Sequence, residues 1–175
     1  LSDAKNNERS NENPSLSDVL MRHLEPTVDM LQDAIRICPE DIWNAQSETR
    51  PVWEYVYHTV FWLNGWLRDW STPFEPPSFH AEEALDLGPV VNTVISKDQM
   101  MTYLEKVRND YRSLVVGETN ETLLRETEQY GKLWSVTDRV FAQVRHIQHH
   151  TAYISAVLRE KADLSLDWEW YSYRE

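Results

Sequence analysis

The sequence predicts an all-α protein, a four-helix bundle. Apolar residues recur at three- and four-residue steps in four stretches, near residues 16–37, 51–70, 96–116 and 135–160. Glycine, which a β-rich domain needs for its turns, occurs only four times in 175 residues. No stretch carries a clear strand pattern. Four long amphipathic helices bury their apolar stripes by packing against one another, and this favours a bundle.

The first helix is expected over residues 16–37. Ser15 is a suitable N-cap, because its hydroxyl can accept a hydrogen bond from an amide of the first turn. Pro26 lies inside the helix and predicts a kink, since proline lacks the amide proton. The pattern stops at Cys38 and Pro39. The apolar stripe consists of Leu16, Leu20, Leu24, Met30, Leu31, Ala34 and Ile35.

The second helix is expected over residues 51–70, with Pro51 at the first helical position, where proline is favourable. This helix is strongly apolar, so we expect it to be largely buried. The following stretch, residues 71–95, contains four prolines and is interpreted as a long connection. Its 25 residues can cross the full length of a helix. The third helix can therefore run parallel to the second.

The last two helices begin with clear signals. Ser96 and Gln99 fit a capping box at the start of the third helix. Residues 118–134 form a second connection, in which one short helical turn is expected. Ser135 is the capping candidate for the fourth helix, which continues to about residue 160.

The chain is interpreted as one domain, residues 15–175, after a polar tail, residues 1–14, that is expected to be disordered. The formal charge is −12, from 17 basic and 29 acidic residues. Phosphate binding needs a basic face, so we expect no nucleic-acid partner and no anionic membrane surface. No apolar run reaches the ~18–20 residues of a membrane span. No signal pattern is visible, and a cytoplasmic protein is expected.

Cysteine and the aromatic residues limit the kinds of site that the chain can build. The single cysteine, Cys38, excludes an internal disulfide and cysteine-rich metal sites, and it is interpreted as a small buried residue. Eight tryptophans and eight tyrosines suffice for both a core and an aromatic-walled pocket. Because eight tryptophans can exceed what one core buries, a homodimer through an aromatic-rich helix face is also expected.

Three of the six histidines, His146, His149 and His150, lie close together in the fourth helix. Neutral imidazole is a common metal ligand, and two histidines one turn apart point to the same side of a helix. At about 100° per residue, His150 lies about 60° and His146 about 100° from Ile147, on the same side of the apolar stripe. His149 lies about 160° away, near the solvent face. The sequence therefore predicts His146 and His150 as metal ligands.

A third ligand is expected from the second helix, because an ion held by two ligands needs another from elsewhere. His58 lies among apolar residues there; alone it would be interpreted as a core histidine, and the pair on the fourth helix changes that interpretation. The fourth helix also carries a polar seam, which suggests a wet cleft or a site between helices, because burying unpartnered polar groups is costly. A solvent-exposed helix edge is the alternative. The seam consists of Arg139, Gln143, His146, His150 and Tyr153.

A substrate pocket is expected beside the three histidines. Its aromatic members offer an apolar wall for a small molecule. His23 faces inward on the first helix, where it serves the pocket or packs at its rim. Glu54, one turn before His58, is either an outer partner of the site or an ordinary first-turn acid. His80, in the proline-rich connection, is expected to be solvated. The expected pocket residues are Tyr55, Trp62, Gln143, Tyr153 and His23.

At these residues the sequence resembles the DinB/YfiT-like superfamily of metal-binding helical bundles. The resemblance rests on residues 53–62 and 144–150 and covers nearly the whole folded region. The superfamily pattern of one histidine on the second helix and an HxxxH pair on the fourth falls on His58, His146 and His150. The resemblance implies a metal-binding bundle with a long crossover between the second and third helices. We expect one divalent metal ion, zinc or nickel, at the three histidines. The run after His150 departs from many relatives, which leaves a substrate contact at Tyr153 unsupported.

Three neutral histidines leave a metal ion open positions, the layout of a catalytic site. The resemblance includes members similar to S-transferases that use a low-molecular-weight thiol, and this is the preferred function. The metal would then hold the thiolate, and Tyr55, Trp62 and Trp66 would cradle the small electrophile. A metal-dependent hydrolase is one alternative. A non-enzymatic metal site is another, since the sequence offers no clear acid–base pair.

Overall fold

The computed structural model describes residues 13–45, 50–87 and 93–168, and within them the protein is mostly helical. The long helices are α1 (Leu16–Ile37), α3 (Val52–Trp66), α4 (Lys97–Val115) and α6 (Val136–Ala162). The short elements are α2 (Glu40–Trp43), the 3-10 turn η1 (Glu82–Ala84), α5 (Asn120–Leu124) and the strands β1 (Thr127–Gln129) and β2 (Lys132–Trp134). The predicted mostly helical fold is confirmed. Most of the predicted tail, residues 1–12, lies outside the described residues.

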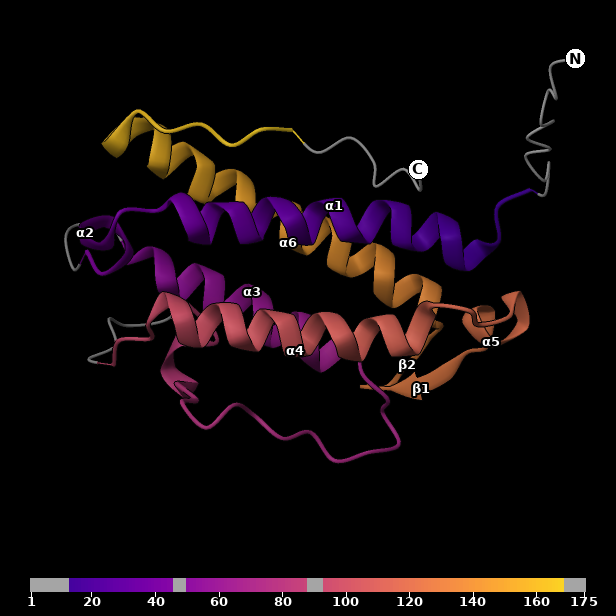
Figure 1. The fold of residues 1–175 in the computed structure, drawn as a ribbon. Coiled ribbons are helices and arrows are strands. Elements are labelled where there is room, and N and C mark those ends of the chain that lie inside the picture. The colour runs from indigo at the N-terminus through magenta and orange to yellow at the C-terminus, as the bar shows by residue number, and fades with distance from the viewer. Residues whose placement is uncertain (1–12, 46–49, 88–92, 169–175) are drawn as a thin grey trace, which may run out of the picture.

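Each long helix packs against two others, α1 against α4 and α6, and α3 against the same two. Figure 1 shows α3 and α4 running in the same direction, with α1 opposite to both. The described first part of the connection, residues 67–87, runs along the outside of the helices, as its length allowed. None of the helices in the described ranges is long and apolar enough to cross a membrane.

Capping boxes start three of the four long helices. Ser15, Ser96 and Ser135 each accept a hydrogen bond from the third residue of the helix that follows. That third residue returns a side-chain hydrogen bond to the backbone amide of the serine, so two free amides are satisfied at each start. The predicted turn after α4 is present as α5. α1 continues as a helix through Pro26.

The end of α3 corrects the predicted range, 51–70, because the helix stops at Trp66. Arg139 of α6 donates from Nη1 to the carbonyl oxygens of Trp66, at 3.1 Å, and Arg68, at 3.2 Å. Carbonyls at a helix end have no partner within the helix, and this guanidinium supplies one from outside. The polar seam on α6 thus begins with a residue that caps a neighbouring helix.

A small antiparallel hairpin within residues 118–134 was not predicted. Thr127 pairs with Trp134 and Gln129 with Lys132. Tyr130 and Gly131 form the turn, with φ angles of 54° and 69°. Two consecutive positive φ angles are the geometry of the tightest hairpin turns. Strands of three residues are too short to show a periodic pattern, which is why the sequence did not reveal them.

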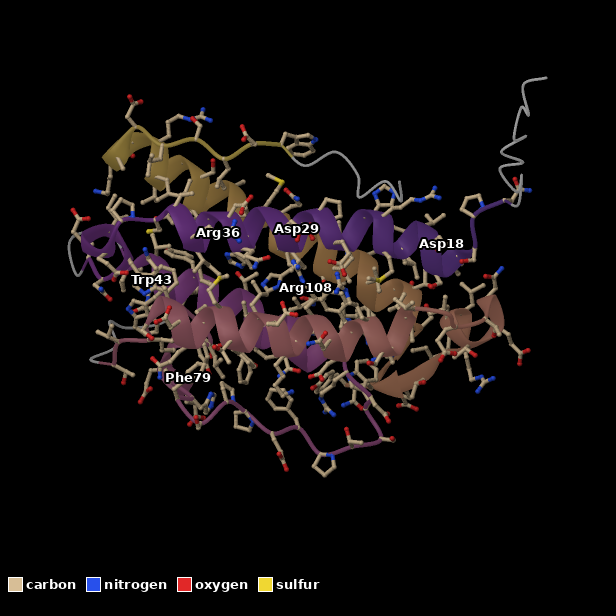
Figure 2. All side chains as sticks on the ribbon, in the orientation of Figure 1. Asp18, Asp29, Arg36, Trp43, Phe79 and Arg108 are labelled. Carbon is tan, nitrogen blue, oxygen red and sulfur yellow. The ribbon has the colours of Figure 1, made fainter. Side chains whose placement is uncertain are left out.

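An ion-pair network joins α1 to α4. Arg108 of α4 contacts Asp29 at 2.6 Å and Glu25 at 3.7 Å, and Arg112 contacts Glu25 at 2.7 Å. Figure 2 labels Asp29 and Arg108 on their two helices. Glu25 is buried, and its two arginine partners offset much of the cost of removing its charge from water.

The aromatic residues divide between the core and the surroundings of the histidines. Trp43 and Trp53 are fully buried, together with Tyr57 and Tyr111. Four other tryptophans are only partly buried, and they lie on α3, just after α3 and on β2: Trp62, Trp66, Trp70 and Trp134. The high aromatic content therefore serves more than core packing.

Candidate metal site

The structure brings His58 of α3 together with His146 and His150 of α6. One ligand atom from each ring lies within 4.8 Å of the others. The ring centroids are 5.1 Å apart for His58 and His146, and 4.7 Å apart for the two pairs with His150. His150 is buried and the other two are partly buried. The rotational argument on the fourth helix selected His146 and His150, and the need for a third ligand selected His58.

Hydrogen bonds at the outer nitrogens orient two of the rings. The Nδ1 atom of His58 lies 2.5 Å from the carbonyl oxygen of Leu85, and Nδ1 of His146 lies 3.2 Å from Oε1 of Gln143. Both oxygens accept, so each Nδ1 carries the proton and each Nε2 keeps its lone pair. Metal-binding histidines usually donate their other nitrogen in this way.

The inner nitrogens fit a metal ion. The Nε2 atoms of His58 and His146 are 3.1 Å apart, and with the protons on Nδ1 neither can donate to the other. Two facing lone pairs repel unless a cation lies between them. Two nitrogens bonded to one zinc ion at about 2.0–2.1 Å with near-tetrahedral angles would lie about 3.3 Å apart. The donor set and its spacing therefore suit a divalent transition-metal ion.

Burial keeps the three rings neutral. Burial lowers the pKa of His146 to about 4, and the neighbouring His58 adds to the effect. Burial also lowers the pKa of His150 to about 3, helped by His146. The pKa of His58 is lowered by burial as well, although its hydrogen bond to Leu85 acts in the opposite direction. Neutral imidazole is the form that binds metal.

A hollow of about 360 Å³ adjoins the histidines. It contains two of the five predicted pocket residues, Trp62 and Gln143. None of the described side chains that line it carries a carboxylate. The hollow is lined by His58, Trp62, Trp66, Gln143 and His146.

The other predicted pocket residues lie outside this hollow. Tyr55 packs against Tyr153, with ring centroids 4.5 Å apart, and against His150 at 6.4 Å. Tyr55 therefore lies between Tyr153 and the buried His150. His23 is exposed and lines a separate depression with Pro26 and other residues of α1 and α6. His149 is exposed, as predicted.

The unpredicted hairpin packs against Trp66, one of the residues that line the hollow. The ring of Trp66 contacts Trp134 at 4.8 Å, Tyr130 at 5.8 Å and Trp70 at 5.8 Å between centroids. Trp134 meets Trp66 edge to face, a favourable aromatic arrangement. The hairpin therefore supports one side of the hollow.

Fold and site together define a mostly helical protein with three histidines that could hold one metal ion. Comparison with known families matches residues 23–154 to the DinB superfamily. The match covers about three quarters of the chain, and the protein belongs to the DinB superfamily. No curated protein and no solved structure matches the chain.

Proposed function

We propose that the protein is a metal-dependent S-transferase, built as a four-helix bundle, that joins a low-molecular-weight thiol to a small electrophile. His58, His146 and His150 would hold one divalent ion, zinc or nickel. The observation that carries the proposal is a group of neutral histidines beside an aromatic hollow. Three histidines contribute no negative charge, so a bound ion would retain its attraction for an anion.

The chemistry would need little from the protein besides positioning. A divalent ion bound here supplies the positive charge that favours the thiolate form of a thiol. The sulfur would then form a bond to an electrophilic carbon, whose leaving group or π bond takes up the electron pair, and the thiol proton would pass to solvent. Trp62 and Trp66 would pack against the apolar part of the electrophile, and Gln143 would keep His146 in its binding orientation.

The lining of the hollow favours the transferase over a hydrolase. Water attack usually relies on a general base, and no described residue that lines the hollow carries a carboxylate. A metal site without turnover is the other candidate function. It is favoured by the way in which His58 on α3 and the pair on α6 would tie two helices together.

The test begins with metal analysis of the purified protein and continues with conjugation assays using several thiols and electrophiles. Activity should require metal, fall on chelation and disappear in His58→Ala with the fold intact. His149→Ala is the matched control, since His149 lies on the same helix but is exposed. Two results together would refute this proposal: no turnover by the metal-loaded protein, and a bound ion that has only protein ligands. The non-enzymatic metal site would then be the better interpretation.

A further inference from the structure

The connection between α3 and α4 is attached to α3 on both sides of η1. At the start of this attachment, the hydroxyl of Tyr57 lies 2.5 Å from Nδ1 of His80 and accepts from the amide of Ala81 at 3.4 Å. A hydroxyl donates one hydrogen bond and accepts two, so the Tyr57 hydroxyl can bond to His80 and Ala81 at the same time. At the other end, the carbonyl of Leu85 accepts from His58.

The segment between these two attachments is short and internally bonded. The amide of Ala84 donates to the carbonyl of Ala81 at 3.1 Å, and the amide of Leu85 donates to that of Glu82 at 3.1 Å. Ala81 and Ala84 are buried against the core. The position of the Leu85 carbonyl therefore depends on where the chain is fixed at residues 80 and 81.

The fixing point at Tyr57 is firm. Tyr57 is fully buried, and its ring contacts Phe61 and Phe79, the latter labelled on the connection in Figure 2. The ring of His80 stacks on Phe61 at 5.2 Å with an interplanar angle of 17°. His80 is exposed, as the sequence suggested, but it has two specific partners on α3.

The Leu85 carbonyl fixes the tautomer and the ring orientation of His58. A neutral imidazole can carry its proton on either nitrogen, and a hydrogen bond at one of them selects the tautomer. Here the carbonyl holds the proton on Nδ1, which leaves the lone pair of Nε2 facing His146 at 3.1 Å. Trp62 also donates to this carbonyl, at 3.4 Å, so the same oxygen orients a wall of the hollow.

We propose that Tyr57 and His80 are positioning residues for the metal centre, and that their contact holds the Leu85 carbonyl where it fixes the tautomer and the orientation of His58. This inference rests on the proposed metal site. Neither residue would contact the ion. Loss of an outer partner of a metal-binding histidine typically weakens metal affinity by about 10- to 100-fold.

The test measures zinc affinity of the full chain by competition with a chromophoric chelator, and the visible spectrum of the cobalt-loaded protein. Tyr57→Phe and His80→Ala should each weaken zinc binding about 10-fold, the low end of that range because the Leu85 carbonyl itself remains, and should alter the cobalt spectrum. The double variant should lose no more than the larger single loss, because both changes break one contact. His80→Asn, whose side-chain oxygen can accept from Tyr57, should recover much of the affinity.

Two matched controls separate positioning from general stability. Tyr103→Phe removes another buried tyrosine hydroxyl, one that accepts from Asn64 at 3.0 Å, and His23→Ala removes an exposed histidine. Both should bind zinc within about twofold of the wild type, on the scale of a residue outside the site. If Tyr57→Phe and His80→Ala keep the wild-type affinity and spectrum while His58→Ala loses binding, the positioning role is refuted and the metal site stands. If Tyr103→Phe loses as much affinity as Tyr57→Phe, the positioning role is also refuted. A wild-type chain that binds no zinc or cobalt refutes both proposals.

Discussion

Replacing Arg139 with methionine should destabilise the fold, although it removes a buried charge. Arg139 is 6% exposed and has no carboxylate within ion-pair distance in the described part of the chain. Its guanidinium donates to the carbonyls of Trp66 and Arg68 and lies 4.1 Å from the ring centre of Trp70. Methionine keeps an apolar stem of similar length but offers no donor.

Two opposing effects set the size of the change. Burial lowers the pKa of Arg139 from 12.5 to about 10. At about 1.4 kcal/mol for each tenfold change, this corresponds to a net cost of roughly 3 kcal/mol for holding the charge there, most of it from burial. Two hydrogen bonds from a charged donor and one cation–π contact stabilise the fold by a total of about 4–6 kcal/mol. The contacts therefore outweigh the cost, and Arg139→Met should lose about 2 kcal/mol.

Urea denaturation at pH 7 measures the change in the free energy of unfolding directly, and thermal unfolding gives a second measure. A loss of about 2 kcal/mol should lower the midpoint of thermal unfolding by about 4–8 °C in a chain of this size. Arg145→Met is the matched control, because Arg145 lies exposed on the same helix and should change stability by less than about 0.5 kcal/mol. If Arg139→Met is as stable as the wild type or more so, the cost of burying the guanidinium dominates and the capping argument is wrong.

Three other predictions concern pH, the ion pairs and assembly. The metal-free protein should lose stability as the pH falls below about 6.5. His146 and His150 then bind protons in the unfolded chain but not in the folded one, where their pKa values are low. Equal urea midpoints at pH 7.5 and 5.5 would contradict this. Glu25→Gln should cost about 1–3 kcal/mol, because it removes the buried carboxylate that pairs with Arg112 at 2.7 Å and with Arg108 at 3.7 Å, whereas exposed Glu121→Gln should cost less than about 0.5 kcal/mol in the same measurement. The hairpin and α6 carry exposed apolar side chains, and a homodimer that covers them stays a prediction. Sedimentation that shows only monomer at micromolar concentration would count against it.

The helices could be predicted because their signals are local. Three helix starts are marked by Ser15, Ser96 and Ser135. Each serine bonds to a residue only three positions further along the chain. Rotation along a single helix likewise separates the inward pair on α6 from exposed His149. The convergence of His58 with this pair follows from the same reasoning once two buried helix faces are placed against each other. Metal binding by the three residues stays a prediction.

The remaining features depend on contacts between distant segments. The partner of His58 is a backbone carbonyl, at Leu85, and a carbonyl has no signature in the sequence. His80 gave no sign of its contact with Tyr57, because that contact exists only when the connection folds back onto α3. Arg139 belongs to a polar seam in the sequence, but only the tertiary structure shows that it ends a neighbouring helix.

The three histidines and the carbonyl that orients one of them come from segments far apart in the chain, and this affects the order of folding. His58 and His146 are 88 positions apart, and the carbonyl that orients His58 comes from a third segment. Contacts between distant positions form late, since long loops must close first. A partly folded chain with α6 formed would offer a metal only the pair on that helix, whereas the complete set exists only after α3 and its connection have docked. Tight metal binding would therefore distinguish finished molecules from folding intermediates, and the metal would stabilise only the finished ones.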